Sequence, residues 1–318
     1  MKKFLLGLLC FTFLFNLAGC TDSQVNIGKL QFEIDKAKET AKAYMISLSQ
    51  GDSDKANSYC KDIKISANEL EKAQNNKINS FKIDRIIEKA DYAYINYKVA
   101  RGNDEDVTAE LDEISLKIEK EEENYLITNV HCESLKQVYR SGDTLRIREE
   151  STGKSQLLLK MKELPRQIYP KRNEVVINKE DVPIGTIDKV SIGFQGERIA
   201  MSLNDGSNTA IIMAMIKQSE PAVAGSGEND NEKQSNDNTE NLDELVEKSI
   251  VGKTTGYDIL SNSTVNKILF SDDVGELIVQ ISTEGQGDSI KVYKNPDGSL
   301  LELQLDKIFP PTQYTVDD

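Results

Sequence analysis

Four cysteines and a single histidine are the side chains in this sequence best suited to covalent chemistry or to metal binding. A disulfide between Cys60 and Cys132 would close a loop of about 70 residues and stabilise the fold by roughly 4 kcal/mol. Two buried free thiols, packed as small apolar groups, are the alternative. His131 has no second histidine and no Cys-x-x-Cys pair to complete the three or four ligands of a zinc site. The sequence therefore indicates no metal site and no cofactor, and His131 is expected to be a structural or surface residue.

Two short glycine-lysine motifs have the composition of the end of a phosphate-binding loop. They are Gly153-Lys154-Ser155 and Gly252-Lys253-Thr254. A complete loop has another glycine five residues before the Gly-Lys pair, and these positions hold Arg148 and Glu247. Both motifs are therefore expected to be solvated turns, and no residue is assigned a catalytic role.

The first nineteen residues have the organisation of a secretory signal peptide. Lys2 and Lys3 form a basic start. The apolar run from Phe4 to Leu17 is too short for a comfortable transmembrane helix, which needs about 20 residues. Residues 1–19 are therefore expected to be removed from the mature protein.

The end of this segment, Leu17-Ala18-Gly19-Cys20, resembles the lipobox of bacterial lipoproteins. The resemblance implies that the thiol of Cys20 receives a diacylglycerol and that the chain is cut between Gly19 and Cys20. Two acyl chains give stable anchoring, whereas one chain is marginal. The mature chain is then expected to begin at Cys20, with residues 20–27 as a tether, on the extracytoplasmic face of a cell membrane. An ordinary secretory signal with a chance cysteine is the alternative.

The charge balance limits the partners that electrostatic attraction can hold. The 318 residues include 39 Lys and Arg against 53 Asp and Glu, for a formal net charge of −14. This balance argues against nucleic acid and against an anionic membrane surface as partners bound by charge. The expected contact with the membrane is the lipid on Cys20, and the other expected partner is an envelope protein or a small ligand.

Residues 28–133 are expected to form an α+β domain in which helices pack on a curved antiparallel sheet. A helix over residues 28–50 is predicted from apolar residues that recur at steps of three and four, namely Leu30, Ile34, Ala37, Ala41, Met45 and Leu48. Gly51 supplies its C-terminal stop, and Asp52 offers a cap for a short second helix. After Lys77 the period changes to two, which predicts four consecutive strands.

This order of helices and strands resembles the nuclear-transport-factor-two-like (cystatin-like) superfamily. The resemblance implies a sheet that curls around the long helix and leaves a cone-shaped pocket. Tyr92 and Tyr94 are predicted to face the same side of one strand, and with Tyr97 they form the best aromatic cluster of the chain. These tyrosines either line such a pocket or pack against the long helix. The acid-base residues of the family's enzymatic members have no matching signature here, so none is assigned.

Residues 134–217 and 242–318 are expected to form an all-β region of repeated hairpins. Three units, each a strand, a turn with glycine and a return strand, begin near Gly142, Gly196 and Gly275. Their spacing becomes regular, at about 54 residues, when the tract between the two regions is subtracted. Strand units of that period resemble the blades of β-propellers, although closed propellers need about four to eight blades. A partial propeller-like assembly and an ordinary sandwich are both open.

Residues 218–241 carry six acidic side chains against one lysine, and the rest of the tract is mostly polar or small. Such a composition cannot bury enough apolar surface to offset the entropy of ordering. This tract is therefore expected to be an acidic disordered linker or insertion.

These patterns predict a membrane-anchored, extracytoplasmic lipoprotein without catalytic activity. It would act as a binding or assembly module for a partner protein or a small ligand. An envelope enzyme with a pocket in the first domain and a structural spacer in an envelope assembly are the alternatives. An enzyme would be recognised by a buried carboxylate, lysine or histidine that points into a pocket and has a displaced pKa.

Overall fold

The computed structural model describes residues 32–62, 75–103, 105–170, 178–217, 247–303 and 305. The predicted signal peptide, the lipobox with Gly19 and Cys20, the tether and the acidic tract lie outside these residues. Within the described ranges, no helix combines the length and the apolar character that crossing a membrane requires.

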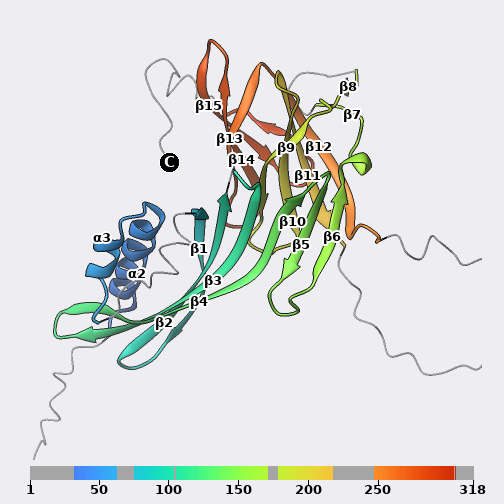
Figure 1. The fold of residues 1–318 in the computed structure, drawn as a ribbon. Coiled ribbons are helices and arrows are strands. Elements are labelled where there is room, and N and C mark those ends of the chain that lie inside the picture. Colours follow the sequence, from blue (N-terminus) through green and yellow to red (C-terminus); the bar gives the residue numbers. More distant parts are fainter. Residues whose placement is uncertain are drawn as a thin grey trace, which may run out of the picture.

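Antiparallel strands make up most of the described chain, and two α-helices precede them (Figure 1). The helices are α2 (Ile34–Ser49), α3 (Ser53–Ser58) and the 3-10 helix η2 (Met161–Glu163). The first sheet contains β1 (Lys77–Glu88), β2 (Tyr92–Asn103), β3 (Thr108–Glu121), β4 (Asn124–Ser141), β5 (Thr144–Glu149) and β6 (Ser155–Lys160). The second contains β9 (Thr186–Ile192), β10 (Arg198–Asn204), β11 (Asn208–Ile216) and β12 (Val251–Ser261). The third contains β13 (Ser263–Phe270), β14 (Glu276–Thr283), β15 (Gly287–Lys294) and β16 (Leu300–Leu301), and a small pair is made of β7 (Gln167–Ile168) and β8 (Glu180–Asp181).

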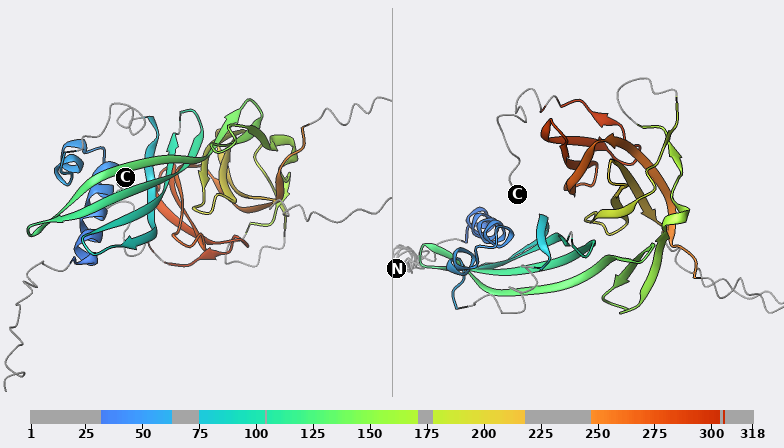
Figure 2. Two further views of the ribbon diagram at one scale, coloured as in Figure 1. Left: turned by 90° about the horizontal axis from the view of Figure 1, so that it is seen from below. Right: turned by 45° about the horizontal axis from the view of Figure 1, so that its top comes forward.

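Strands that follow one another in the sequence are also neighbours in each sheet. The six-stranded sheet has the order β1-β2-β3-β4-β5-β6, and the four-stranded sheets have the orders β12-β11-β10-β9 and β13-β14-β15-β16. Among the described residues, none of these sheets closes into a barrel. Figure 2 shows the long strands of the first sheet running from the helices to the other sheets.

Helix α2 forms because its apolar side chains recur on one face. Ala37 and Ala41 are fully buried, and they belong to a hydrophobic cluster with residues of β1–β4, which we call the α2 core. The helix ends at Ser49, and Gly51 follows with a φ of 71°, a left-handed conformation that favours glycine. The predicted helix and its glycine stop are confirmed from Ile34 onward.

The six-stranded sheet carries a hydrophobic core on each of its faces. Val99 belongs to the α2 core, whereas its neighbour Ala100 belongs to a larger cluster that extends through β9–β15, which we call the shared core. Successive residues of a strand point to opposite faces, so the two cores lie on opposite sides of the sheet. The sheet does not end at the predicted boundary after residue 133, because β4 places Ile127 in the α2 core and Val138 in the shared core.

The second sheet is buried on both faces at its centre. Every residue from Ile199 to Leu203 in β10 and from Ala210 to Ala214 in β11 is buried. The shared core joins this sheet to residues of the first sheet and of β13–β15, so it is covered from both sides. The sequence of a strand that is covered on both faces is a continuous run of apolar residues and does not alternate between apolar and polar residues.

The three predicted hairpin units are confirmed as hairpins, but they do not form successive blades. They correspond to β5–β6, β10–β11 and β14–β15, and each lies in a different sheet. Strand β5 also pairs with β4, across the turn at Gly142 and Asp143. The propeller-like arrangement is therefore not found, because one unit extends the long sheet and does not form a sheet of its own.

Candidate ligand-binding site

A hollow with a volume of about 870 Å³ opens where three connections of the chain meet. The connections are η2 with the loop after it, the loop between β8 and β9, and the turn between β10 and β11. The lining residues are Met161, Lys162, Leu164, Pro165, Arg166, Asp181, Val182, Pro183, Ile184, Leu203, Asp205, Asn208 and Ile259. A concave site of this size with a mostly apolar lining is typical of small-molecule binding.

The floor of the hollow is the outer surface of the shared core. Leu203 comes from β10 and Ile259 from β12, and Leu164 and Val182 come from the two loops. All four side chains are buried and belong to the shared core. An apolar group that enters the hollow therefore meets packed hydrophobic side chains whose positions the three sheets hold.

One wall of the hollow, Val182–Gly185, is held tightly against its neighbours. The backbone N–H of Val182 donates to the carbonyl oxygen of Arg166 at 2.9 Å, which ties the two loops together. A Cβ on Gly185 would lie 1.7 Å from the carbonyl oxygen of Asn204, so only glycine fits there. This close approach leaves Ile184 at the rim of the hollow with 96% of its surface exposed.

The two carboxylates that line the hollow already have hydrogen-bond partners. Asp181 accepts from Nε2 of Gln167 at 2.7 Å. Asp205 accepts from the backbone N–H of Asn208 at 2.7 Å and of Ser207 at 2.9 Å. These turn hydrogen bonds, with Asn208 first, lower the pKa of Asp205 below its ordinary value. Both acids therefore have structural roles in the walls.

The two cations of the lining, Lys162 and Arg166, have no side-chain hydrogen bond or ion pair with any described residue. Both are exposed; Lys162 lies in η2 and Arg166 in the loop after it, on either side of the buried Leu164. Long basic side chains commonly lay their apolar stems along a surface while the charged heads stay in water. The lining therefore has two carboxylates with hydrogen-bond donors from neutral groups and two cations that are free to donate to a ligand.

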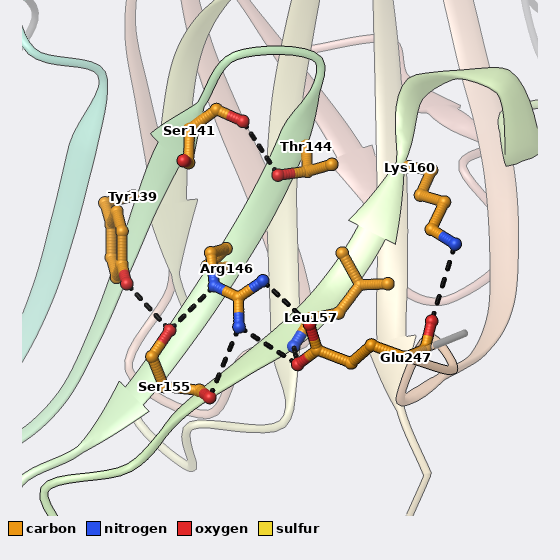
Figure 3. Close-up of polar contacts among 8 residues, drawn as sticks. All are labelled: Tyr139, Ser141, Thr144, Arg146, Ser155, Leu157, Lys160 and Glu247. Atoms are coloured by element: carbon orange, nitrogen blue, oxygen red, sulfur yellow. Dashed lines mark hydrogen bonds and ion pairs between the residues drawn. The ribbon is translucent and has the colours of Figure 1, made fainter. Parts of the chain in front are cut away.

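A polar cluster holds residues 247–250 against the edge of β6 (Figure 3). The guanidinium of Arg146 donates to both carboxylate oxygens of Glu247, at 2.9 and 3.0 Å. The backbone N–H of Leu157 donates to the same carboxylate at 2.8 Å. Nε of Arg146 donates to the hydroxyl of Ser155 at 2.8 Å, and that hydroxyl lies 2.7 Å from the hydroxyl of Tyr139. We call these residues the Glu247 clamp.

Hydrogen bonds in the Glu247 clamp shift the pKa values of its members. The guanidinium of Arg146, followed by the backbone of Leu157, lowers the pKa of Glu247. The hydroxyl of Ser155 lowers the pKa of Tyr139, against the opposing effect of burial. The shift of Glu247 favours the carboxylate form that binds the guanidinium of Arg146, as expected of a structural clamp.

The backbone after Glu247 continues the attachment and leads to the hollow. The N–H of Ile250 donates to the carbonyl of Leu157 at 3.2 Å, and the N–H of Lys217 donates to the carbonyl of Ile250 at 2.9 Å. Strand β6 then runs into η2, which lines the hollow, and β12 carries Ile259 to its floor. The clamp thus fixes two elements of the hollow relative to each other.

The three predicted pocket tyrosines do not meet in one pocket. Tyr92 and Tyr94 do share a face, with ring centroids 5.6 Å apart, and the Lys117 ammonium lies 4.6 Å from the centre of the Tyr92 ring. Tyr97 lies on the other face, packed in the α2 core with its ring centroid 5.8 Å from that of Phe81. Burial raises the pKa of Tyr97 to about 12. Strand alternation separates an odd-numbered residue from two even-numbered ones, so the shared pocket is not formed.

Cys60 and Cys132 are free thiols, which is the alternative to the disulfide considered above. Both are partly buried beside the α2 core, and burial raises the pKa of Cys60 to about 11. The sulfur of Cys132 lies 4.0 Å from Oδ2 of Asp112. His131 is exposed on the opposite face of β4. Within the described part of the chain, no three His, Cys, Asp or Glu side chains are placed to hold a metal ion.

The residues of the hollow were not singled out from the sequence. Several of its apolar members, among them Leu164, Val182 and Ile184, lie in loops, where neither the helical nor the strand period marks them. One signal is visible in retrospect, since Val182-Pro183-Ile184-Gly185 is an apolar run too short for a strand and bounded by proline and glycine.

No protein-family model matches this chain, and no curated protein matches it either. Among solved structures, the chain is similar to the crystal structure of a DUF4783 family protein from Bacteroides ovatus. The identity is 14% and the TM-score is 0.25, and the match covers 29% of this chain and 93% of the other. A likeness as weak as this bears on neither the fold nor the function of the chain.

Proposed function

We propose that this protein is a lipid-anchored protein of the extracytoplasmic membrane face that binds a small apolar molecule in the hollow. The observation that carries the proposal is the floor of the hollow, where buried leucine, isoleucine and valine side chains of the shared core line about 870 Å³ of open space. Burying apolar surface there would contribute about 25 cal/mol per Å² of contact. The protein then acts by holding its ligand and has no catalytic role.

The anchor is proposed from the lipobox, with Cys20 as the lipidated residue. Eleven residues, 21–31, separate this cysteine from Phe32, where the described chain begins, and the chain from Cys20 to Phe32 spans at most about 40 Å when extended. Phe32 packs on Tyr125, with ring centroids 5.3 Å apart, at the same end of the first sheet as α2. This end of the molecule would therefore face the membrane.

The fold supports a position of the hollow away from the anchored end. In Figure 1, α2 lies at one end of the molecule, and β7 and β8, which flank the loops of the hollow, lie at the other. We infer that α2, α3 and β1–β4 form the α+β unit of the nuclear-transport-factor-two-like type. That unit would connect the anchor to the sheets that carry the hollow. The observation that supports this inference is the α2 core, which joins the helices to β1–β4.

Binding in the hollow can be tested with phenylnaphthylamine, a neutral apolar dye that fluoresces when water is removed from it. The Cys20→Ala protein should bind the dye saturably, and Ile184→Ser at the rim should weaken binding about tenfold, because it removes apolar contact. Ile87→Ser is the matched control, since Ile87 is an exposed isoleucine on β1. Absence of saturable binding, or equal effects of the two variants, would overturn the proposal.

The anchor can be tested separately by cell fractionation. Cys20→Ala should move the protein from the membrane to the soluble fraction, because no thiol is left to carry the lipid. Cys60→Ala is the control and should leave the protein on the membrane. A Cys20→Ala protein that stays membrane-bound contradicts the assignment of the anchor.

A further inference from the structure

We propose that the hollow selects apolar molecules that carry one anionic group, and that Lys162 and Arg166 bind this group at its mouth. The inference rests on the proposed function, because it names the chemical class of the ligand for the same site. Its basis is that the acids of the lining have hydrogen-bond partners, whereas the cations have none among the described residues.

The hydrogen bonds that the structure gives the two carboxylates of the hollow come from neutral groups and not from these cations. Asp181 is held by Gln167, and Asp205 is held by the backbone of its own turn. Lys162 and Arg166 form no side-chain hydrogen bond or ion pair with any residue the structure describes. In a chain with a net charge of −14, two unmatched cations beside one hollow depart from the prevailing charge.

The placement of the two cations implies a ligand with an apolar part and an anionic part. Leu164 lies between them in sequence, is buried and forms part of the apolar floor. Lys162 and Arg166 flank it and remain exposed, so their heads lie at the mouth while the floor stays apolar. A bound molecule would therefore place its apolar body on Leu164 and its anionic group between the two heads.

The chemistry of the cations favours an oxyanion with two or more equivalent oxygens. A guanidinium binds a carboxylate, phosphate or sulfonate through two parallel N–H donors, and an ammonium adds a point charge. Because both groups are exposed, each contributes modestly, and we expect the anionic group to strengthen binding by about five- to tenfold. We assign the ligand to a free molecule and not to a lipid in the membrane, because β7 and β8, which flank the loops of the hollow, lie at the end of the molecule opposite α2 (Figure 1).

A pair of dyes isolates the contribution of charge. Anilinonaphthalene sulfonate and phenylnaphthylamine share an aromatic body, and only the former carries an anionic group. The Cys20→Ala protein should bind the sulfonate about five- to tenfold more tightly at low salt, and the advantage should shrink as salt screens the exposed charges. Adding Lys162→Gln and Arg166→Gln should remove this advantage, so that the affinity for the sulfonate falls several-fold more than the affinity for phenylnaphthylamine.

A matched variant controls for net charge. Lys89→Gln with Lys154→Gln removes two exposed positive charges elsewhere and should leave the affinity for both dyes unchanged. If both dyes bind equally, or if the two double variants act alike on the sulfonate, the inference fails while the proposed function stands. If neither dye binds, the proposed function itself fails.

A sedimentation assay separates a free ligand from a membrane lipid. The Cys20→Ala protein should stay in solution when mixed with vesicles of phosphatidylglycerol, an anionic lipid. Sedimentation that depends on Lys162 and Arg166 would overturn the assignment to a free molecule.

Discussion

A buried ion pair at the junction of the two cores offers the sharpest test of the structure. Nε of Arg101 donates to Oδ2 of Asp112 at 2.8 Å, and the two side chains are only 7% and 0% exposed. Arg101 also donates to the carbonyl of Asn76 at 3.3 Å. The pair lies on the sheet directly beside Ala100 and Leu111, where the strands pass from the α2 core to the shared core.

Asp112→Asn keeps the shape of the side chain and removes its charge, which takes away the carboxylate that pairs with the buried guanidinium of Arg101 at 2.8 Å. Breaking a buried pair in this way costs about 3–5 kcal/mol, a large part of the 5–15 kcal/mol that stabilises a typical domain. The double variant Arg101→Met with Asp112→Leu replaces the pair by apolar side chains, and we expect it to be more stable than Asp112→Asn.

Urea unfolding followed by circular dichroism measures these free energies. The midpoint should fall for Asp112→Asn while the slope stays constant, which shows that stability changed and not compactness. Asp35→Asn is the control, because the pair of Asp35 with Lys38 is 86% and 39% exposed and should be worth little. A loss below about 1 kcal/mol for Asp112→Asn, or a double variant less stable than it, would refute the reasoning.

Three further predictions concern the hollow, the clamp and a thiol. Gly185→Ala should weaken dye binding and lower the melting temperature, because its Cβ would lie 1.7 Å from the Asn204 carbonyl oxygen and the wall must move. Glu247→Gln should speed hydrogen exchange at the Leu157 amide at neutral pH, because the carboxylate that accepts from this amide is removed. Arg146 lowers the pKa of Glu247, so the stabilising effect of the clamp is fully present above the ordinary carboxyl pKa and is lost only as the pH falls through the lowered pKa. Cys60 should be alkylated at pH 8 about 100-fold more slowly than in the urea-unfolded chain, because burial raises its pKa from 9.0 to about 11 and thiolate is the reactive form.

Each of these predictions has an outcome that contradicts it. Unchanged dye binding in Gly185→Ala would show that the wall does not shape the hollow. Equal exchange in Glu247→Gln and the wild type would remove the carboxylate from its place on β6. Equal alkylation of Cys60 in the folded and unfolded chain, measured by peptide mass spectrometry, would show that this thiol is not buried.

The sequence patterns that predicted local structure correctly are those with a short-range physical cause. The spacing of Ala37 and Ala41 predicted α2, because residues three and four apart share a helix face. The glycine turns predicted all three hairpins, because a tight turn with alternating flanks pairs its own neighbours. The same local reasoning did not reveal that the sheet continues past residue 133, because β4 is one strand from Asn124 to Ser141 while the core beneath it changes.

The functional site depended on contacts that sequence spacing does not encode. Tyr92, Tyr94 and Tyr97 are close in sequence, yet strand alternation sends Tyr97 to the opposite face. Leu164, Val182, Leu203 and Ile259 are far apart in sequence, yet they converge on one floor.

The sequence by itself determined the elements of this protein and the expectation of a lipid anchor, because helix period, turn chemistry and a leader segment are properties of neighbouring residues. The tertiary structure alone decided that one long sheet serves two cores and that three loops enclose a hollow. The physical reason is that burial of a loop residue such as Leu164 depends on which sheets stack beneath it. That stacking is set by the complementary shapes of surfaces contributed by residues about 100 positions apart, and no local pattern records it.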